Sequence, residues 1–214
     1  MRYLIVCGGK IDKEFGLNEI KTDGIDAIIA ADSGMDFLYE NGVTPDIIVG
    51  DFDSTTTNAL EYFERKGQTE IRRLNPIKDD TDTEYAIRLA ISEGARSIVL
   101  LGATGSRIDH VLGNISLLGI GLESGTDISI IDTNNRIRMA DKPVTIEKSA
   151  QYGRVVSLIA LTDDNEVSLK GFKYPVTDYS FDRFTSLGIS NEIVDDHALI
   201  DIHRGKFIII ESKD

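Results

Sequence analysis

The first half of the chain carries short, continuous apolar runs separated by segments with helical periodicity. These runs occupy residues 3–7, 27–31, 47–49 and 98–101, with a further strand candidate at 71–74. A continuous run of four or five apolar residues is typical of a strand that is buried on both faces. Strands alternating with helices predict a mostly parallel sheet with helices on both sides.

The helical segments have recognisable ends. A helix over 33–41 is predicted to stop at Gly42 and one over 55–66 at Gly67, because glycine is favoured just after a helix. Thr81 and Glu84 form a capping box that opens a helix running to about residue 93. A further helix is predicted from about residue 109 to 118.

The second half changes character. Only short strand candidates are visible, punctuated by glycine and proline, at 144–147, 155–161, 166–170, 198–203 and 206–211. Such spacing indicates an antiparallel sandwich or barrel. We therefore expect an α/β protein: an N-terminal, mostly parallel α/β sandwich domain over residues 1–134, followed by a C-terminal all-β sandwich domain over residues 135–214.

Composition narrows the function classes. The chain has 214 residues and a formal net charge of −13, which repels phosphate backbones and makes nucleic acid an unexpected partner. No apolar run approaches the roughly 20 residues that span a bilayer, and the first run is shorter than a secretory core. The single cysteine, Cys7, excludes an internal disulfide or a Cys-rich zinc site. We expect a cytoplasmic protein without a membrane partner.

Aspartates follow the predicted strands. Asp32 comes directly after one strand, and Asp51 and Asp53 come after another. Asp79 and Asp82 lie between the 71–74 strand and the next helix. The ligand site of an open α/β sheet lies beyond the carboxyl ends of its strands, so these side chains are expected at one edge. In extended backbone Asp51 and Asp53 would point the same way.

Such a group of carboxylates needs a cation. Two unit charges about 4 Å apart repel by about 4 kcal/mol at an effective dielectric near 20. Oxygen ligands favour Mg²⁺, which also binds substrate phosphates. The alternative is that these residues are helix caps and turn formers, an explanation that suits Asp80 or Thr81 better than the whole set.

The segment from Asp51 to Thr55 also allows a second interpretation. An Asp-x-Asp pair after an apolar strand is found in haloacid-dehalogenase phosphatases, where the first Asp is the nucleophile. That motif normally follows the first strand, whereas here two strand units precede it, and no later segment supplies the family's acidic metal motif. The aspartate group and the phosphate chemistry of Mg²⁺ favour an enzyme that transfers a phosphate group from a nucleotide. A magnesium-dependent phosphatase of the haloacid-dehalogenase type is the alternative.

A glycine turn follows the strand at 98–101. Gly102, Thr104 and Gly105 lead into a helix, and backbone N–H groups at such a turn favour an anion. The turn matches neither the Walker A loop nor the dinucleotide fingerprint. Arg107 is the better phosphate contact, since guanidinium binds phosphate in a fork. Asn114 shares its helix face, with His110 beside it.

Taken together, these segments resemble the thiamine pyrophosphokinases of bacteria. The resemblance runs in order along nearly the whole chain, including the α/β-then-β layout. The matching stretches are Ala31–Gly34, Pro45–Ser54, Lys78–Glu84, Gly102–His110 and Ser186–Glu192.

The resemblance implies a reaction in which ATP, the co-substrate, passes its pyrophosphoryl group to the hydroxyl of thiamine, giving thiamine diphosphate and AMP. It implies that Asp51, Asp53 and Asp82 hold Mg²⁺ and form the catalytic group, with Asp32 and Asp79 nearby. The expected contacts with ATP come from Gly102, Thr104, Gly105, Arg107, Asp109, His110 and Asn114.

The resemblance also implies a thiamine site in the β domain. Ser186, Ser190 and Asn191 are the expected contacts, within a homodimer whose active sites are shared between chains. Some family members place a tryptophan against thiamine, but this chain has none, so Tyr174, Tyr179, Phe181 and Phe184 are the candidate replacements. A nucleotide-binding sensor without catalysis is the alternative from a different class.

Overall fold

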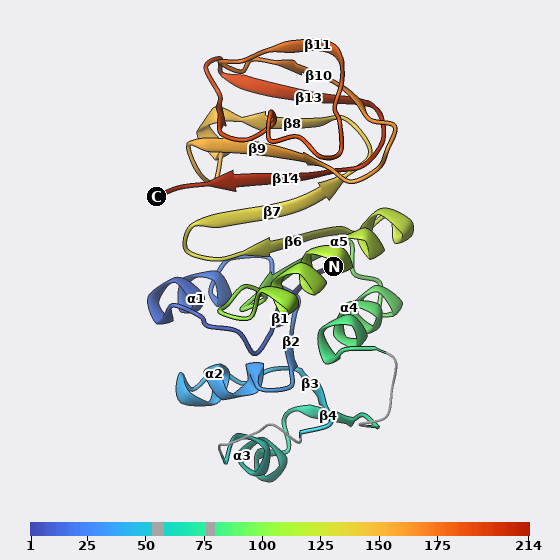
Figure 1. Cartoon of the computed structure of the whole chain (residues 1–214). Coiled ribbons are helices and arrows are strands. Elements are labelled where there is room, and N and C mark those ends of the chain that lie inside the picture. The colour runs from blue at the N-terminus through green and yellow to red at the C-terminus, as the bar shows by residue number, and fades with distance from the viewer. Residues whose placement is uncertain (53–57, 76–79) are drawn as a thin grey trace. The chain divides into compact units, whose positions relative to one another are not determined.

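The computed structural model describes residues 1–52, 58–75 and 80–214, and these divide into two compact units, Met1–Thr133 and Asn134–Asp214. Figure 1 shows the helices and strands of each. None of the helices in the described part is long and apolar enough to cross a membrane.

The first unit is a parallel sheet with helices on both faces. Its strands are β1 (Arg2–Val6), β2 (Ala27–Ala31), β3 (Ile47–Gly50), β4 (Glu70–Arg73), β5 (Ser97–Leu101) and β6 (Asp127–Ile131). Its helices are α1 (Lys13–Ile20), α2 (Gly34–Glu40), α3 (Ala59–Lys66), α4 (Asp82–Ser92) and α5 (Ile108–Ser124). The strand order is β6-β5-β1-β2-β3-β4, and the pairings described are parallel. The predicted parallel α/β architecture is confirmed.

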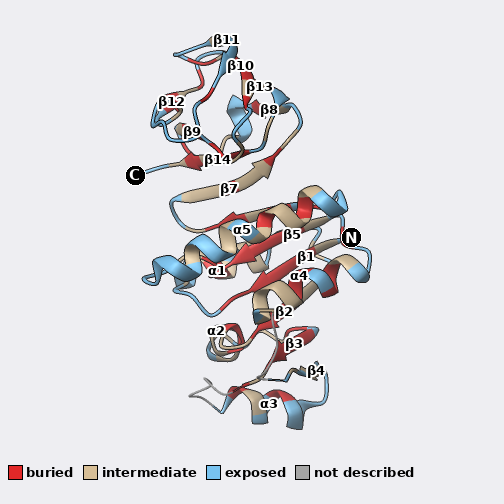
Figure 2. Ribbon diagram, turned by 45° about the vertical axis from the view of Figure 1, so that its right-hand side comes forward, coloured by how far each residue is buried: buried red, intermediate tan, exposed pale blue. Residues whose placement is uncertain are grey.

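The strand order reverses direction once. From β1 the chain moves through β2 and β3 to β4, then returns across the sheet to place β5 on the other side of β1. Leu4 and Val6 of β1 pack with α2 and α3 residues such as Met35 and Phe63 in one core cluster. Helix α4 packs against β1, β2 and β3, and Figure 2 shows how completely β1 and β5 are buried. The crevice between β1 and β5 is the switch point at which such sheets bind ligands.

The structure confirms one predicted helix boundary and differs from the prediction at another and at the backbone after Asp51. Thr81 caps α4 as expected, since its hydroxyl accepts from the Glu84 amide at 3.2 Å. Helix α5 continues to Ser124 instead of stopping near residue 118, because Gly121 is accommodated where the helix touches β6. Phe52 has φ +64°, so the chain after Asp51 is not extended, contrary to our expectation.

The second unit is an antiparallel sandwich. One sheet has the order β12-β9-β14-β7 and the other β11-β10-β13-β8. The strands are β7 (Asn135–Ala140), β8 (Val144–Glu147), β9 (Val155–Ala160), β10 (Glu166–Lys170), β11 (Val176–Ser180), β12 (Asn191–Glu192), β13 (His197–Arg204) and β14 (Phe207–Ser212). Inward-facing residues of both sheets, among them Val156, Val167, Ile200 and Phe207, form one core. The predicted all-β sandwich is confirmed.

A buried ion cluster lies within this second unit. The Glu211 side chain is 0% exposed and accepts hydrogen bonds from Arg136 Nε and Nη2 at 2.8 and 2.7 Å. It also accepts from Arg138 Nη2 at 2.9 Å and from the Tyr152 amide at 2.8 Å. Both arginines are about three-quarters buried, with exposures of 28% and 23%. The carboxylate therefore ties β14 to β7 and to the loop that carries Tyr152.

Candidate functional site

A pocket of about 910 Å³ opens at the carboxyl ends of β1, β2 and β5, at the switch point of the sheet. The loop after β1, the end of β2, the start of α4 and the turn before α5 form its wall. The predicted site residues that line it are Asp32, Asp82, Gly102, Thr104, Gly105, Arg107, Asp109, His110 and Asn114. These predicted residues come from three distant parts of the sequence, and the loop after β1 adds a fourth.

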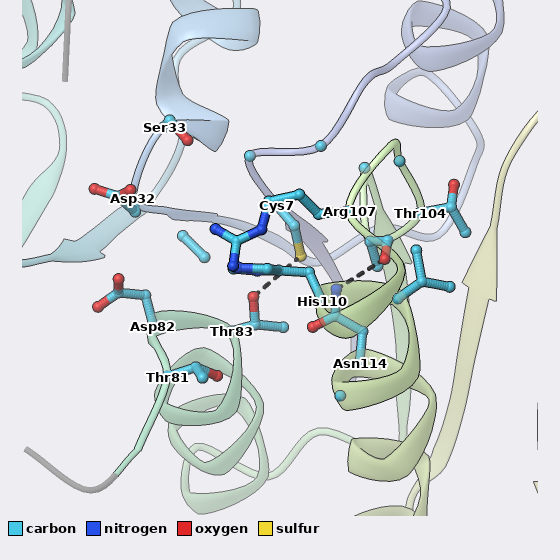
Figure 3. Close-up of a pocket in the computed structure, with 18 of the residues that line it drawn as sticks. Cys7, Asp32, Ser33, Thr81, Asp82, Thr83, Thr104, Arg107, His110 and Asn114 are labelled. Atoms are coloured by element: carbon cyan, nitrogen blue, oxygen red, sulfur yellow. Dashed lines mark hydrogen bonds between the residues drawn. The ribbon is translucent and has the colours of Figure 1, made fainter. Parts of the chain in front are cut away.

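Three carboxylates gather at one side of the pocket, and two of them, Asp32 and Asp82, line it. One oxygen each from Asp32, Asp51 and Asp82 lies within 4.8 Å of the other two. Figure 3 shows Asp32 and Asp82 on the same side of the pocket. Each side chain is half-buried. Asp53 and Asp79, which we also expected here, lie outside the described residues.

The backbone at this group is unusual. Asp32 has φ +48° and Phe52 has φ +64°, both in the left-handed region that non-glycine residues seldom adopt. The turn at Asp32 is fixed by its amide, which donates to Val49 O at 2.7 Å. Phe52 turns its ring into the core beneath the sheet. These two turns set the carboxylates of Asp32 and Asp51 at the edge of the sheet.

The donor set suits Mg²⁺. All the ligand atoms are oxygens, as this ion prefers, and two oxygens on opposite sides of one magnesium lie about 4.2 Å apart. Oxygens at adjacent positions lie about 3.0 Å apart, so three oxygens within 4.8 Å of one another can share one ion once the side chains move closer together. Asp32, expected only near the metal, is a full member of the group.

The opposite side of the pocket presents a glycine turn and a guanidinium. Gly102 has φ +72°, and Asn114 Nδ2 donates to the carbonyl of Ala103 at 2.8 Å, which holds the turn against α5. Arg107 reaches into the middle of the pocket (Figure 3). Its Nη2 and Nε contact Asp109 at 2.6 and 3.3 Å. The guanidinium of Arg107 lowers the pKa of Asp109 to about 2, so this acid stays charged at neutral pH.

The loop after β1 was not predicted to be part of the site. Cys7, Gly8, Gly9 and Lys10 all line the pocket. Burial raises the pKa of the Cys7 thiol to about 11, and Thr83 Oγ1 donates to its sulfur at 3.7 Å, so this group is a neutral part of the floor. The signal that could have revealed this loop is a pair of adjacent glycines directly after a buried strand.

The predicted thiamine residues lie in the second unit. Ser186 and Ser190 are exposed, and Ser190 has φ +64°. Asn191 is buried, and its amide group is occupied: Oδ1 accepts from Tyr174 N at 3.1 Å and Nδ2 donates to Tyr174 O at 3.0 Å. Asn191 therefore holds the loop that presents Tyr174.

The four aromatic candidates differ in exposure. Phe181 is 4% exposed and belongs to the core, so it is not available for stacking. Tyr174, Tyr179 and Phe184 are 61%, 39% and 90% exposed. Tyr174 is thus the exposed ring that the predicted binding segment itself holds in place.

Comparison with known proteins places these two units in one family. The thiamin pyrophosphokinase catalytic domain matches residues 21–130, and the vitamin B1 binding domain of the same enzyme matches residues 143–207. The thiamine pyrophosphokinase of Bacillus subtilis (strain 168) is 34% identical over 188 residues, 87% of each chain.

Solved structures agree. A crystal structure of thiamine pyrophosphokinase from Bacillus subtilis has a TM-score of 0.89 and 32% identity, covering all of both chains. One from Geobacillus thermodenitrificans has a TM-score of 0.87 and 29% identity, covering 100% of this chain and 98% of the other. These findings support neither the haloacid-dehalogenase phosphatase nor the sensor. The chain belongs to the thiamin pyrophosphokinase family.

Proposed function

We propose that this chain transfers the pyrophosphoryl group of ATP to the hydroxyl of thiamine, and that the reaction depends on Mg²⁺. The observation that carries the proposal is the pocket at the switch point, with Asp32 and Asp82 in its wall next to Asp51, and a glycine turn with Arg107 on the opposite side. The family of the chain supplies the acceptor, because one of the two matched domains is named for vitamin B1 binding.

In this proposal the chain mainly positions the two substrates and neutralises the charge of the phosphates. The thiamine hydroxyl oxygen bonds to the β-phosphorus of ATP, the bond from that phosphorus to the oxygen bridging the α-phosphate breaks, and AMP leaves with that oxygen. One carboxylate of the Asp32, Asp51 and Asp82 group takes the hydroxyl proton. Mg²⁺ held by this group would offset charge on the phosphates. Arg107 and the amides of the 102–105 turn orient the phosphate chain.

The test is release of AMP from ATP by the purified chain. AMP should form with thiamine diphosphate in equal amounts, and only when thiamine and Mg²⁺ are both added. Phosphate release without thiamine would indicate a phosphatase, and trapping a phospho-aspartate at Asp51 would establish the haloacid-dehalogenase mechanism. ATP binding with no product would indicate the sensor. Each of these results would overturn the proposal.

The thiamine site is proposed to include Ser186, Ser190 and the ring of Tyr174, which Asn191 holds. Replacing Ser190 with alanine removes one hydroxyl, so the thiamine KM should rise about five- to tenfold, as expected for one hydrogen bond of about 1 kcal/mol, while the ATP KM stays unchanged. Asn191→Ala should do the same by releasing Tyr174. Tyr174→Phe, which keeps the ring, is the matched control, and a rise in both KM values would contradict the assignment.

We propose further that the chain works as a homodimer with shared sites, in the cytoplasm. Exposed apolar side chains support the dimer: Ile108 and Leu112 on α5 are 66% and 60% exposed, and Phe184 and Leu187 are 90% and 59% exposed. Sedimentation at micromolar concentration should give a dimer; a monomer that still converts thiamine would contradict shared sites.

The cytoplasmic location rests on the single cysteine, Cys7, which needs no oxidising compartment.

A further inference from the structure

The loop after β1 and the turn after β5 form a single backbone surface at the floor of the pocket. The amide of Cys7 donates to Leu101 O at 2.7 Å, and the amide of Gly9 donates to Gly102 O at 2.8 Å. A side chain at position 9 would overlap the carbonyl oxygens of Gly102 and Thr104. The two segments can therefore approach this closely only because residue 9 is glycine.

Lys10 is the next residue after Gly9. A Cβ atom at Gly105 would lie 3.9 Å from the backbone nitrogen of Lys10, so Lys10 starts beside the glycine turn. Its side chain is exposed and lines the pocket. Lys10 is thus fixed next to the turn at its backbone, while its ammonium group is free to reach into the cavity.

The charges around the pocket single Lys10 out. Arg107 already contacts Asp109 through two nitrogens, and Glu84 is engaged by Arg88 at 2.7 Å. Lys10, by contrast, makes no ion pair or side-chain hydrogen bond with any of residues 1–52, 58–75 and 80–214. Among the described lysines and arginines that line the pocket, it is the one whose charge is not already matched by a carboxylate.

A nucleotide triphosphate brings about four negative charges into a pocket that also holds Asp32, Asp82 and Asp109. A divalent ion at the carboxylate group offsets only part of that charge, and the charge of Arg107 is already partly matched by Asp109. An ammonium group on a flexible stem is a good phosphate ligand because it acts as a compact point charge.

We propose that Lys10 binds the phosphate chain of the nucleotide and is a main determinant of its affinity. The inference rests on the proposed function, since it requires ATP in this pocket. It adds a residue from the loop after β1 to the phosphate contacts that the sequence indicated around the 102–105 turn.

The experiment is calorimetric titration of the intact protein with Mg–ATP and with magnesium tripolyphosphate. Lys10→Ala should lower the affinity for both ligands by about tenfold or more, which is the loss expected for one hydrogen bond to a charged group. Lys10→Arg should restore most of the affinity. Lys13→Ala is the matched control: this exposed lysine lies on α1, outside the pocket lining, so both affinities should equal those of the unmodified chain.

The outcomes separate the two proposals. If the unmodified chain binds ATP and Lys10→Ala binds it equally well, this inference is overturned and the proposed function stands. A lower affinity for ATP with an unchanged affinity for tripolyphosphate would also overturn it, because the lysine would then act on the nucleoside. If the unmodified chain binds no ATP, the proposed function fails, and this inference fails with it.

Discussion

Replacing Asp82 with asparagine should lower the thiamine-dependent formation of AMP by at least about a hundredfold, and Asp51→Asn should do the same. Each change removes one negative charge from a group whose ligand oxygens lie within 4.8 Å of each other, so Mg²⁺ should bind more weakly and phosphate charge should be less well offset. The measurements are kcat at saturating substrates and the affinity for Mg²⁺ by calorimetry.

Stability gives an independent readout of the same group. The carboxylates repel one another without a cation, by about 4 kcal/mol for a pair about 4 Å apart at an effective dielectric near 20. Without metal, Asp82→Asn should therefore melt at a temperature equal to or above that of the unmodified chain. Asp36→Asn, on α2 and outside the pocket lining, is the control for loss of one charge and should keep its activity. Full activity in both Asp51→Asn and Asp82→Asn would refute the metal assignment.

The largest loss of stability is expected from Glu211→Gln in the second unit. The glutamine keeps the shape of the side chain but leaves Arg136 and Arg138 about three-quarters buried without their counter-charge. Removing one partner of a buried ion pair costs about 3–5 kcal/mol. Urea unfolding, monitored on the full chain, should show a transition for the second unit at a clearly lower midpoint.

Glu166→Gln is the matched control for that prediction. Glu166 pairs with Arg204 at 2.8 Å in the same unit, but the arginine is 54% exposed. Such a pair contributes at most about 1 kcal/mol. Equal midpoints for Glu211→Gln and Glu166→Gln would show that the buried cluster has no special role in stability.

Much of the fold could be predicted because its strands are marked by local composition. The strand over residues 27–31 and those over 144–147 and 166–170 were predicted at their observed bounds. Helix α5 was predicted too short, because Gly119 and Gly121 interrupt its apolar pattern. The local pattern does not show that β6 lies beside this helix. Gly121 allows the helix to pack against that strand.

Strands β6, β7, β11 and β12 were not predicted, and β11 and β12 show the physical reason. Strand β11 is exposed over most of its length, and β12 has only two residues. Both depend on pairing with β10 and β9 and not on their own apolar content. Short edge strands carry little signal in a single sequence.

The site was predictable where acidic residues lie at or just beyond the carboxyl ends of predicted strands. Asp32, Asp51 and Asp82 are separated by up to 50 positions, yet the rule that ligands bind at the carboxyl ends of parallel strands brings them together. Gly9 and Lys10 were not predicted, because a glycine pair after a strand is an ordinary turn until its contact with Gly102 is seen. Asn191 looked like a ligand group, but its amide is used to hold Tyr174.

The left-handed backbone at Asp32 and Phe52 has an evolutionary consequence. A non-glycine residue held in this region costs on the order of 1–3 kcal/mol, and glycine would remove much of that cost. At position 52, however, glycine would also remove the ring that anchors the turn in the core, and at position 32 it would remove a carboxylate. Selection for thermal tolerance alone would favour glycine at position 32, whereas selection for the proposed metal site opposes it there; at position 52 the loss of a buried ring outweighs the strain that glycine would relieve. Members of this family adapting to heat should therefore gain stability elsewhere and leave these two turns unchanged.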